Sequence, residues 1–264
     1  TTSMKRTYVK LLTVAGLTGC FLFTSCRSAQ ETTARYEISK VEGNMITIDS
    51  TWDANPDKKA TTVLKPYKDK VDAMMYEVIG TSEMKMDKGT PESLLSNLVA
   101  SVLQEAAAQV LGKPADMGLV NMGGLRNILP KGDITVGAVF EILPFENSLC
   151  VLTMKGTDMK RLFKAIASLH GEGVSGIRLE INKKGELLNA TIGGKPVVDD
   201  QLYTVATIDY LADGNGRMDA FLQAEKRECP EDATLRGLFL DYVRKQTAEG
   251  KIITSKLDGR ITVK

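Results

Sequence analysis

The chain has 264 residues, of which 43% are hydrophobic and 25% are charged, and its formal net charge is +1. This length accommodates one large domain or two small ones, and the composition is typical of a globular protein with a hydrophobic core. Because neither charge is in excess, we exclude a protein that binds nucleic acid polymers or anionic membranes through a general electrostatic field.

The N-terminal residues combine the features of an export signal. Met4-Lys5-Arg6 is basic and precedes an apolar stretch over residues 11–23 that is too short to span a membrane. Cys20 and Cys26 each end a segment that resembles the lipobox of bacterial lipoproteins. We expect Cys26 to carry the lipid, because a polar segment follows it directly, whereas cleavage before Cys20 would leave Phe21-Leu22-Phe23 on the mature tail. An ordinary cleaved signal with incidental cysteines is the alternative.

This interpretation divides the chain into a signal peptide over residues 1–26, a linker over residues 27–34 and one domain over residues 35–264. It predicts a lipoprotein of the cell envelope, periplasmic or associated with the outer membrane. Such a protein meets the membrane through its lipid anchor alone. The choice of leaflet stays open.

Two further cysteines, Cys150 and Cys229, stand 79 positions apart without CxxC spacing, so nothing in their pattern supports a metal site. An export signal would permit a disulfide between them. Cys150, however, lies in the apolar run Leu149-Cys150-Val151-Leu152. We therefore expect a buried free thiol there.

The first third of the chain predicts a hairpin and two helices. Residues 35–51 alternate apolar and polar around a glycine, which is typical of a hairpin. Apolar residues at spacings of three and four predict a helix over residues 57–75, with Pro66 either kinking it or standing near its start. Thr90-Pro91-Glu92 predicts the beginning of a second helix, and the wide apolar stripe over residues 94–111 places that helix in the core.

Strand and helix patterns alternate through the rest of the chain. We expect strands at residues 76–80, 119–120, 148–154, 177–181, 187–192, 203–208 and 260–263, and helices at residues 135–140, after Gly156 and over residues 230–249. Because hairpins and helices are mixed in this order, the predicted fold class is α+β, with mixed sheets packed with helices.

The segment over residues 121–147 carries the most chemistry. It opens with Asn121, the pair Gly123-Gly124 and Arg126, and it closes with Leu143-Pro144-Phe145-Glu146-Asn147. Adjacent glycines let a backbone turn and approach a ligand closely. Asn both donates and accepts hydrogen bonds, and Arg offers a planar fork for a carboxylate or phosphate. These groups suit a flat, polar, anionic ligand, although a plain turn and a core phenylalanine are the structural alternative.

These motifs resemble the C-terminal domain of the 5'-nucleotidase / UDP-sugar hydrolase family, which carries Asn-x-Gly-Gly-[Leu/Ile]-Arg followed by Leu-Pro-Phe-x-Asn. The resemblance continues through Leu152–Met159, Ser175–Arg178 and Tyr203–Ala212. It implies a 5'-nucleotidase C-terminal domain-like fold that binds the base and sugar of a nucleotide and presents its phosphate to a separate metal site.

The resemblance also implies roles for individual residues. Asn121 would hydrogen-bond the base, Phe145 would stack on it, Arg126 would contact the ribose, and Gly123 and Gly124 would allow close backbone approach. The implied substrate-binding set is Asn121, Gly123, Gly124, Arg126, Phe145, Asn147, Asn215 and Arg217. Two positions depart from the family pattern. Arg217 stands where the family has a second stacking aromatic, and Pro91 stands where it tends to carry an arginine.

Family members also have an N-terminal metallophosphatase domain, which nothing in this sequence resembles. His170 is the one histidine, whereas a site with two metal ions needs several His and Asp ligands. We expect His170 at the surface near a helix end. We expect no catalytic residue, metal or other cofactor in this chain, and divalent metals in a partner chain.

We therefore interpret the protein as the nucleotide- or nucleoside-recognition half of a split extracytoplasmic 5'-nucleotidase. Such an enzyme hydrolyses phosphoric monoesters in nucleotide catabolism, with its metal site on a separate metallophosphatase chain. The alternatives are a non-catalytic surface lipoprotein that binds nucleotides or nucleosides, and a scaffold that has lost the ligand.

Overall fold

The computed structural model describes residues 37–264 and divides them into two compact units, which meet between Pro56 and Asp57. The predicted signal over residues 1–26 with Cys20 and Cys26, and the predicted linker over residues 27–34, lie outside the described residues. In the first unit, η1 (Ser50–Ala54) is a short 3-10 helix whose cap, Asp49, accepts the N–H of Thr51 at 2.9 Å.

The hairpin predicted over residues 35–51 is wrong for its described part. Residues 37–49 contain no strand, and Ile38, Ile46 and Ile48 are exposed. The apolar residues do alternate, but alternation does not supply a surface on which a hairpin can bury its apolar face. An isolated two-stranded hairpin is marginally stable in water for that reason.

The second unit opens with α2 (Lys58–Met75), whose cap Asp57 accepts the N–H of Ala60 at 2.8 Å. This helix runs through Pro66 and does not begin there. The chain then enters β1 (Val78–Ser82), which pairs antiparallel with β3 (Gly132–Thr135). Thr135 caps α5 (Val136–Ile142), as predicted, by accepting the N–H of Ala138 at 3.1 Å.

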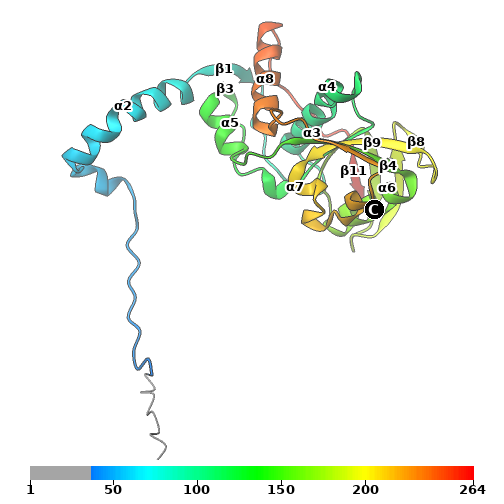
Figure 1. Cartoon of the computed structure of the whole chain (residues 1–264), viewed down its shortest axis with the longest axis horizontal. Helices are drawn as coiled ribbons and strands as arrows, with labels where there is room; N and C mark the ends of the chain where they lie inside the picture. The colour runs from blue at the N-terminus through cyan, green and yellow to red at the C-terminus, as the bar shows by residue number, and fades with distance from the viewer. Residues whose placement is uncertain (1–36) are drawn as a thin grey trace, which may run out of the picture. The chain divides into compact units, whose positions relative to one another are not determined.

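A five-stranded sheet forms the centre of this unit (Figure 1). Its order is β10 (Lys226–Glu228), β4 (Leu149–Lys155), β9 (Leu202–Ile208), β2 (Met117–Val120) and β5 (Gly173–Ser175). Strands β2 and β9 are parallel, β4 is antiparallel to β9, and β5 is antiparallel to β2. The ends of β2 and β9 therefore lie at the same edge of the sheet as the starts of β4 and β5.

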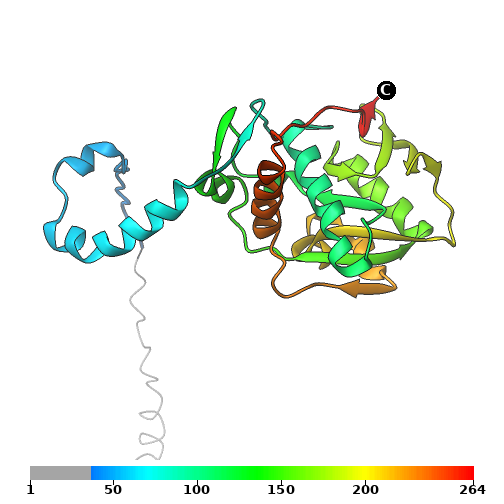
Figure 2. The same ribbon diagram turned by 90° about the horizontal axis from the view of Figure 1, so that it is seen from above.

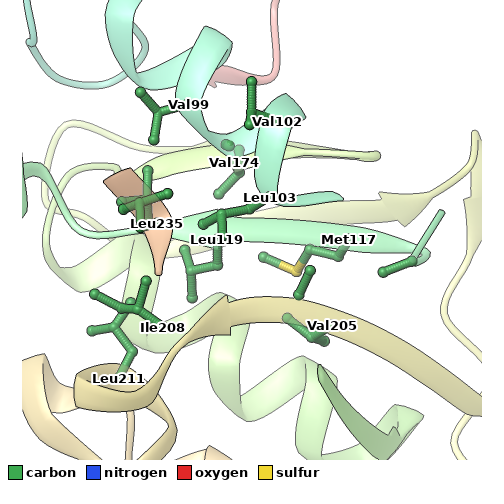
Figure 3. Packing of buried hydrophobic residues seen from close by; sticks show 14 of the residues in the cluster. Val99, Val102, Leu103, Met117, Leu119, Val174, Val205, Ile208, Leu211 and Leu235 are labelled. Carbon is green, nitrogen blue, oxygen red and sulfur yellow. The ribbon is translucent and has the colours of Figure 1, made fainter. Parts of the chain in front are cut away.

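The apolar stripe over residues 94–111 forms α3 (Leu94–Ala106) and α4 (Ala108–Leu111), which ends at Gly112 in the left-handed conformation. Helix α3 packs against β2, β5 and α8 (Leu235–Ala248), as Figure 2 shows for α8. Val99, Val102 and Leu103 of α3 join side chains of β2 and β9 in one buried cluster (Figure 3). Leu94–Leu111 is long and apolar enough to cross a membrane, but in this fold it is the core helix pair.

Helix α6 (Gly156–Ser168) packs against β4 and β9, with Leu162, Phe163 and Ile166 buried as predicted. The predicted strands are confirmed to within two residues at each end. The short strands β3, β5, β10 and β8 (Lys195–Pro196) were not predicted. Helix α8 begins five residues later than predicted, with Thr234 as its cap.

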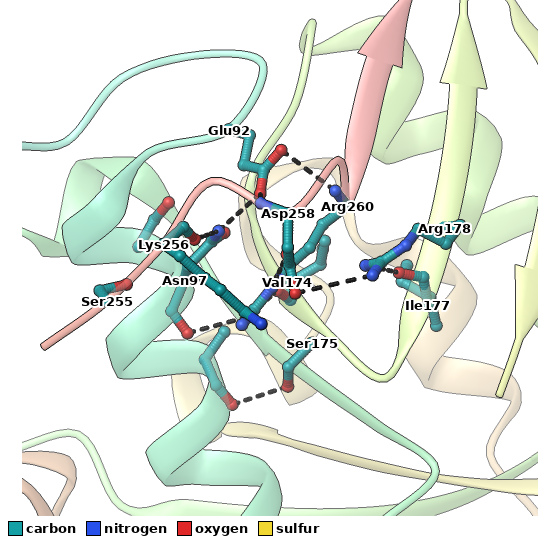
Figure 4. Close-up of polar contacts among 12 residues, drawn as sticks. Glu92, Asn97, Val174, Ser175, Ile177, Arg178, Ser255, Lys256, Asp258 and Arg260 are labelled. Atoms are coloured by element: carbon teal, nitrogen blue, oxygen red, sulfur yellow. Dashed lines mark hydrogen bonds and ion pairs between the residues drawn. The ribbon is translucent and has the colours of Figure 1, made fainter.

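Helix α3 also begins later than predicted. Its cap is Ser93, which accepts the N–H of Ser96 at 3.3 Å, and not Thr90. The physical reason is that Glu92 is engaged elsewhere: its carboxylate accepts the backbone N–H groups of Asp258 at 2.9 Å and Arg260 at 3.1 Å (Figure 4).

A second, four-stranded sheet has the order β11 (Ile261–Val263), β6 (Ile177–Ile181), β7 (Leu187–Ile192) and β8 (Lys195–Pro196). Arg260, directly before β11, donates to the carbonyls of Asn97 at 2.9 Å and Val174 at 2.7 Å (Figure 4). One guanidinium thus ties the C-terminal strand to α3 and to β5. The two sheets and the core helix are joined through this point.

The expectation of a free thiol at Cys150 is wrong, because Cys150 forms a disulfide with Cys229, with 4.2 Å between their Cα atoms. Strand β10 pairs antiparallel with β4, so that Glu228 lies opposite Val151. This register brings the residue after β10 against the second residue of β4. The pairing depends on a short strand that has no distinctive pattern in the sequence.

Removing the disulfide should destabilise the domain. The bond joins residues 79 positions apart, and a crosslink over a loop of that size typically contributes about 2–4 kcal/mol to the free energy of unfolding. We expect Cys150→Ala/Cys229→Ala to lose that amount in urea unfolding. Wild-type protein unfolded with a thiol reductant should show the same loss. A wild-type protein indifferent to reductant would show that the two thiols are free.

Candidate functional site

Four loops meet at the sheet edge where β2 and β9 end and β4 and β5 start. Asn121 directly follows β2, and Asp209 directly follows β9. Phe145 and Asn147 lie four and two residues before β4, and Glu172 directly precedes β5. The loops are joined by backbone contact, since Arg126 donates its N–H to the carbonyl of Ile142 at 2.9 Å. Sheet topology therefore brings the two motifs of the predicted site together.

The glycine pair is shaped around the amide of Asn121. A Cβ atom at Gly124 would lie 3.0 Å from the Oδ1 atom of Asn121, and one at Gly123 would lie 3.4 Å from its Nδ2 atom. The Oδ1 atom is buried, and within the described residues no group donates a hydrogen bond to it. A buried acceptor without a donor costs free energy and is rare in native proteins. This unsatisfied oxygen makes Asn121 a candidate acceptor for a hydrogen bond from a bound molecule.

Two charged residues that the sequence did not single out hold this loop. The carboxylate of Glu172 accepts the N–H of Met122. The ammonium of Lys88 donates to the carbonyl of Leu125 at 2.5 Å. Burial raises the pKa of Glu172 to about 7, although the hydrogen bond from Met122 lowers it in part. Neither residue belongs to a local motif, so only the pairing of β2 with β5 could have revealed Glu172.

Arg126 is exposed, and its guanidinium lies over its own loop, with Nη1 at 3.4 Å from the carbonyl oxygen of Gly123. That long contact leaves most of the planar fork available. Phe145 is likewise at the surface, with 49% of its area exposed. An aromatic ring with half its surface in water can still cover another flat ring.

Arg236, in the first turn of α8, holds the loop that carries Phe145. The Arg236 guanidinium donates to the carbonyl of Leu143 at 3.1 Å, forms an ion pair with Glu146, and lies 4.1 Å from the ring centre of Phe140. Burial lowers the pKa of this arginine below its ordinary value. The buried guanidinium binds Leu143 before Pro144-Phe145 and Glu146 after them. The backbone at Phe145 is therefore anchored to helix α8.

Asn147 has a structural contact of its own. Its Nδ2 atom donates to the Oδ1 atom of Asp209 at 2.8 Å, which links the start of β4 to the end of β9. This bond connects the Phe145 loop with α7 (Asp209–Ala212) and the turn beyond it. Asn147 thus positions two of the loops, whatever it contacts in a ligand.

Asn215 and Arg217 lie in η3 (Asn215–Arg217), the exposed turn that follows α7. Arg217 has φ of +68°, a conformation that non-glycine residues seldom adopt. Among the described residues, no hydrogen bond ties Arg217 to the Asn121 loop or to the Phe145 loop. The structure therefore places this turn at the same edge without joining it to the other predicted residues.

His170 is exposed directly after the cap of α6, at the surface position expected for it. Within residues 37–264, no group of three or more His, Cys, Asp or Glu side chains is arranged to hold a metal ion.

The comparison with known proteins agrees with the motifs and the fold. The model of the family described as "5'-nucleotidase, C-terminal domain" matches residues 78–223. This match takes in more than half of the chain, and the protein belongs to this family.

Several relatives are much longer than this chain. It is 27% identical to the trifunctional nucleotide phosphoesterase protein YfkN of Bacillus subtilis, over 83% of this chain and 16% of that protein. It is also 27% identical to the cell wall protein Lmo0130 of Listeria monocytogenes, over 80% of this chain and 30% of that protein. Among solved structures, the 5'-nucleotidase precursor of Thermus thermophilus is similar with a TM-score of 0.66 and 26% identity, over 80% of this chain and 44% of that one. The chain thus spans less than half of each.

Glu172 should make the stability of the domain depend on pH. Its pKa in the folded state, about 7, lies above its ordinary value of 4.5, so the folded state holds the proton more tightly. The free energy of unfolding should therefore fall as pH rises from about 4.5 to about 7 and should change no further above that range. Glu172→Gln keeps an acceptor for Met122 and removes the charge. We expect it to be more stable than wild type at pH 8 by about 1–3 kcal/mol, and similar to it at pH 4.5, in urea unfolding. A pH-independent difference would contradict this cause.

Arg236 should contribute more to the stability of the domain than its exposed ion-pair partner, Glu146. Arg236→Met leaves the Leu143 carbonyl without its donor, and we expect a loss of about 1–3 kcal/mol in the free energy of unfolding. Faster hydrogen exchange over residues 143–147 should accompany the loss. Glu146→Gln is the control, because the Glu146 side chain is 73% exposed and its ion pair should contribute less than about 1 kcal/mol. Equal losses in the two variants would show that the ion pair, and not the buried guanidinium, holds the loop.

Proposed function

We propose that this chain is the nucleotide- or nucleoside-recognition half of a split extracytoplasmic 5'-nucleotidase. The observation that carries the proposal is the shared sheet edge, where a buried amide oxygen of Asn121 without a donor lies on the loop bonded to the segment that presents Phe145. A base offers both an N–H donor and a flat face. Its N–H group would satisfy the Asn121 acceptor, and its ring would stack on Phe145.

The remaining groups at this edge suit the sugar and the phosphate. Arg126 would contact the ribose through the free part of its guanidinium fork, and Asn215 and Arg217 would approach from the turn after α7. The hydrogen bond between Asn147 and Asp209 would hold the Phe145 loop and the turn after α7 in fixed positions relative to each other. In this proposal the chain contributes binding and orientation, which lower the barrier of a reaction by fixing the ester relative to the attacking group.

Hydrolysis itself belongs, in this proposal, to a separate metallophosphatase chain whose divalent metals activate water and stabilise charge on the phosphoryl group. The support is the family membership together with the name of one relative, which is a nucleotide phosphoesterase. This chain matches only part of each such protein.

We place the reaction in the cell envelope, with the chain held at the membrane by a lipid on Cys26. The lipobox-like segments of the sequence support this location. The Cys150–Cys229 disulfide supports it independently, because such bonds persist in oxidising compartments outside the cytoplasm. A relative from Listeria monocytogenes is named as a cell wall protein.

Phe145→Ala should weaken nucleoside binding. Stacking of a base on an aromatic side chain contributes about 1–3 kcal/mol, so the Kd for adenosine or AMP should rise about 5- to 150-fold in calorimetry. Leu188→Ala is the matched control, because Leu188 is also about half exposed but lies on β7 of the other sheet. Unchanged binding in Phe145→Ala would contradict every nucleotide role for this edge.

The catalytic part of the proposal needs a separate test. The purified chain should show no metal-dependent release of phosphate from AMP by itself, and it should raise the activity of a metallophosphatase encoded in the same operon when the two are mixed. Nucleoside binding without such an effect on any metallophosphatase of the source organism would instead identify a non-catalytic binding lipoprotein.

A further inference from the structure

The turn after α7 carries two of the proposed ligand-binding residues, Asn215 and Arg217, and its backbone is unusual. Gly214, Gly216 and Arg217 have positive φ, at +83°, +66° and +68°. Positive φ is unfavourable for a residue with a Cβ atom, so Arg217 keeps this conformation only where its surroundings impose it. The backbone hydrogen bonds of the turn are local, as when Met218 donates to Asn215 at 3.2 Å. Contact with a more distant part of the chain is therefore needed to fix the turn.

The side chain of Arg227, on β10, reaches this turn. Its Nη1 atom donates to the Oδ1 atom of Asp213, the residue before the first positive φ, at 2.7 Å. Its Nε atom lies 3.2 Å from the Sγ atom of Cys229, and its Nη2 atom lies 3.8 Å from the Sγ atom of Cys150. In the described part of the chain, no other charged side chain forms an ion pair with Asp213. One planar guanidinium thus joins the turn to both sulfur atoms of the disulfide.

Strand β10 is itself a small element. It lies at one edge of the five-stranded sheet and pairs with β4 through three residues, with Arg227 opposite Leu152. Cys229 directly follows this strand, and its bond to Cys150 closes the end of the pairing. By comparison, β4 and β9 pair over seven residues. Three pairs without a crosslink hold an edge strand weakly, so the disulfide determines where β10, and with it Arg227, lies.

We propose that Arg227 is a positioning residue for nucleotide binding, which fixes the turn after α7 through Asp213 and is itself held by the Cys150–Cys229 disulfide. This role rests on the proposed function, in which Asn215 and Arg217 approach the ligand from that turn. Affinity for a nucleotide would then depend on whether the disulfide is formed.

The geometry distinguishes this ion pair from an ordinary surface pair. The side chains of Arg227 and Asp213 are 40% and 57% exposed, and a pair so exposed contributes little to stability by itself. The pair nevertheless joins two separate elements, and the two sulfur contacts restrain the guanidinium that meets the carboxylate. Lys226 and Glu228 form an exposed pair on the same strand, but that pair does not leave β10. Loss of Arg227 should therefore affect the order of the turn more than the global stability.

Reduction of the disulfide is a balanced exchange with a dithiol. The dithiol supplies two electrons and two protons, the bond between the two Sγ atoms breaks, Cys150 and Cys229 become thiols, and the dithiol becomes a disulfide. Cys229 is exposed and Cys150 is buried, so the exchange begins at the sulfur of Cys229. Once the bond is open, β10 keeps three residue pairs and the central strands keep all of theirs. The turn after α7 should loosen while the sheet stays folded.

Hydrogen exchange tests the positioning role without any ligand. Arg227→Met removes the guanidinium, and amide exchange over residues 213–218, followed by mass spectrometry, should accelerate at least about threefold. Asp213→Asn, which removes the other charge of the pair, should give the same change. Lys226→Met is the matched control, because it removes a cation and an ion pair from the same strand, and it should leave exchange in this segment as in wild type. Unchanged exchange in Arg227→Met, or an equal acceleration in Lys226→Met, would overturn the proposal.

Calorimetry measures the consequence for the ligand. A mobile turn must be ordered on binding, so the Kd for AMP should rise about two- to tenfold in Arg227→Met and stay unchanged in Lys226→Met. Asn215→Ala/Arg217→Asn removes both proposed ligand-binding side chains of the turn, and asparagine tolerates positive φ. In that background Arg227→Met should raise the Kd by less than about 1.5-fold further. Effects that add in full would show that Arg227 acts elsewhere and would overturn the role.

Reduction tests the dependence on the disulfide. Wild type is treated with dithiothreitol until the Cys150–Cys229 bond is absent by mass spectrometry, and circular dichroism checks that the fold is kept. It should then bind AMP with the Kd of Arg227→Met, and reoxidation should restore the original Kd. Cys150→Ala/Cys229→Ala should show the weaker Kd with and without reductant. Fully reduced wild type that binds AMP as tightly as the oxidised protein would show that the disulfide does not hold Arg227.

The outcomes separate this role from the proposed function. If wild type binds neither AMP nor adenosine, the proposed function is wrong, even where Arg227→Met speeds exchange in the turn. If wild type binds AMP and Arg227→Met changes neither the exchange nor the Kd, the positioning role is wrong and the proposed function stands.

Discussion

The structure depends on the parallel pairing of β2 with β9 in the centre of the five-stranded sheet. The strands on either side of this pair, β5 and β4, run antiparallel to it. In this arrangement two strands end and two strands start at one edge, where Thr207 also donates to the carbonyl of Leu119 at 2.9 Å. Segments as distant in sequence as Asn121, Phe145, Glu172 and Asp209 meet there without any one of them having to reach across the molecule. Ligand sites at the ends of parallel strands follow from the same geometry in other mixed folds.

Convergence alone does not make a site, because loops move unless something holds them. Here each loop is held by a charged or polar group from a neighbouring element: Arg236 under the Phe145 loop, Glu172 and Lys88 on the Asn121 loop, and Asn147 between β4 and β9. Arg236, Glu172 and Lys88 bind backbone atoms of these loops, and Asn147 binds the carboxylate of Asp209. In the proposed function, the Asn121 oxygen, which has no partner among the described residues, would thereby be held ready for a ligand before it arrives.

The periodicity of the sequence predicted most strands and the core helix, because those elements bury a face whose pattern repeats every two or every three to four residues. It failed where a feature depends on two distant segments. The Cys150–Cys229 bond requires the register of β10 on β4, and the late start of α3 requires Glu92 to meet residues 258 and 260. Arg236, Glu172 and Lys88 are single charges without a local pattern. The hairpin over residues 35–51 failed for the opposite reason, since a pattern was present but no surface was available to cover it.

Pro91 stands where the family tends to carry an arginine, but another cation, Lys88, lies nearby in the sequence and contacts the Asn121 loop. The family arginine is absent there, yet Lys88 brings an ammonium to the same loop, where it is bound to the carbonyl of Leu125. An ammonium engaged in this way is a point charge without the fork that binds phosphate oxygens in pairs. In the proposed function the loop is therefore better equipped for the base and sugar than for the phosphate. Such a chain would discriminate the nucleoside and leave the phosphate exposed, which is the arrangement that the proposed hydrolytic partner would require for its own metals to bind the phosphoryl group.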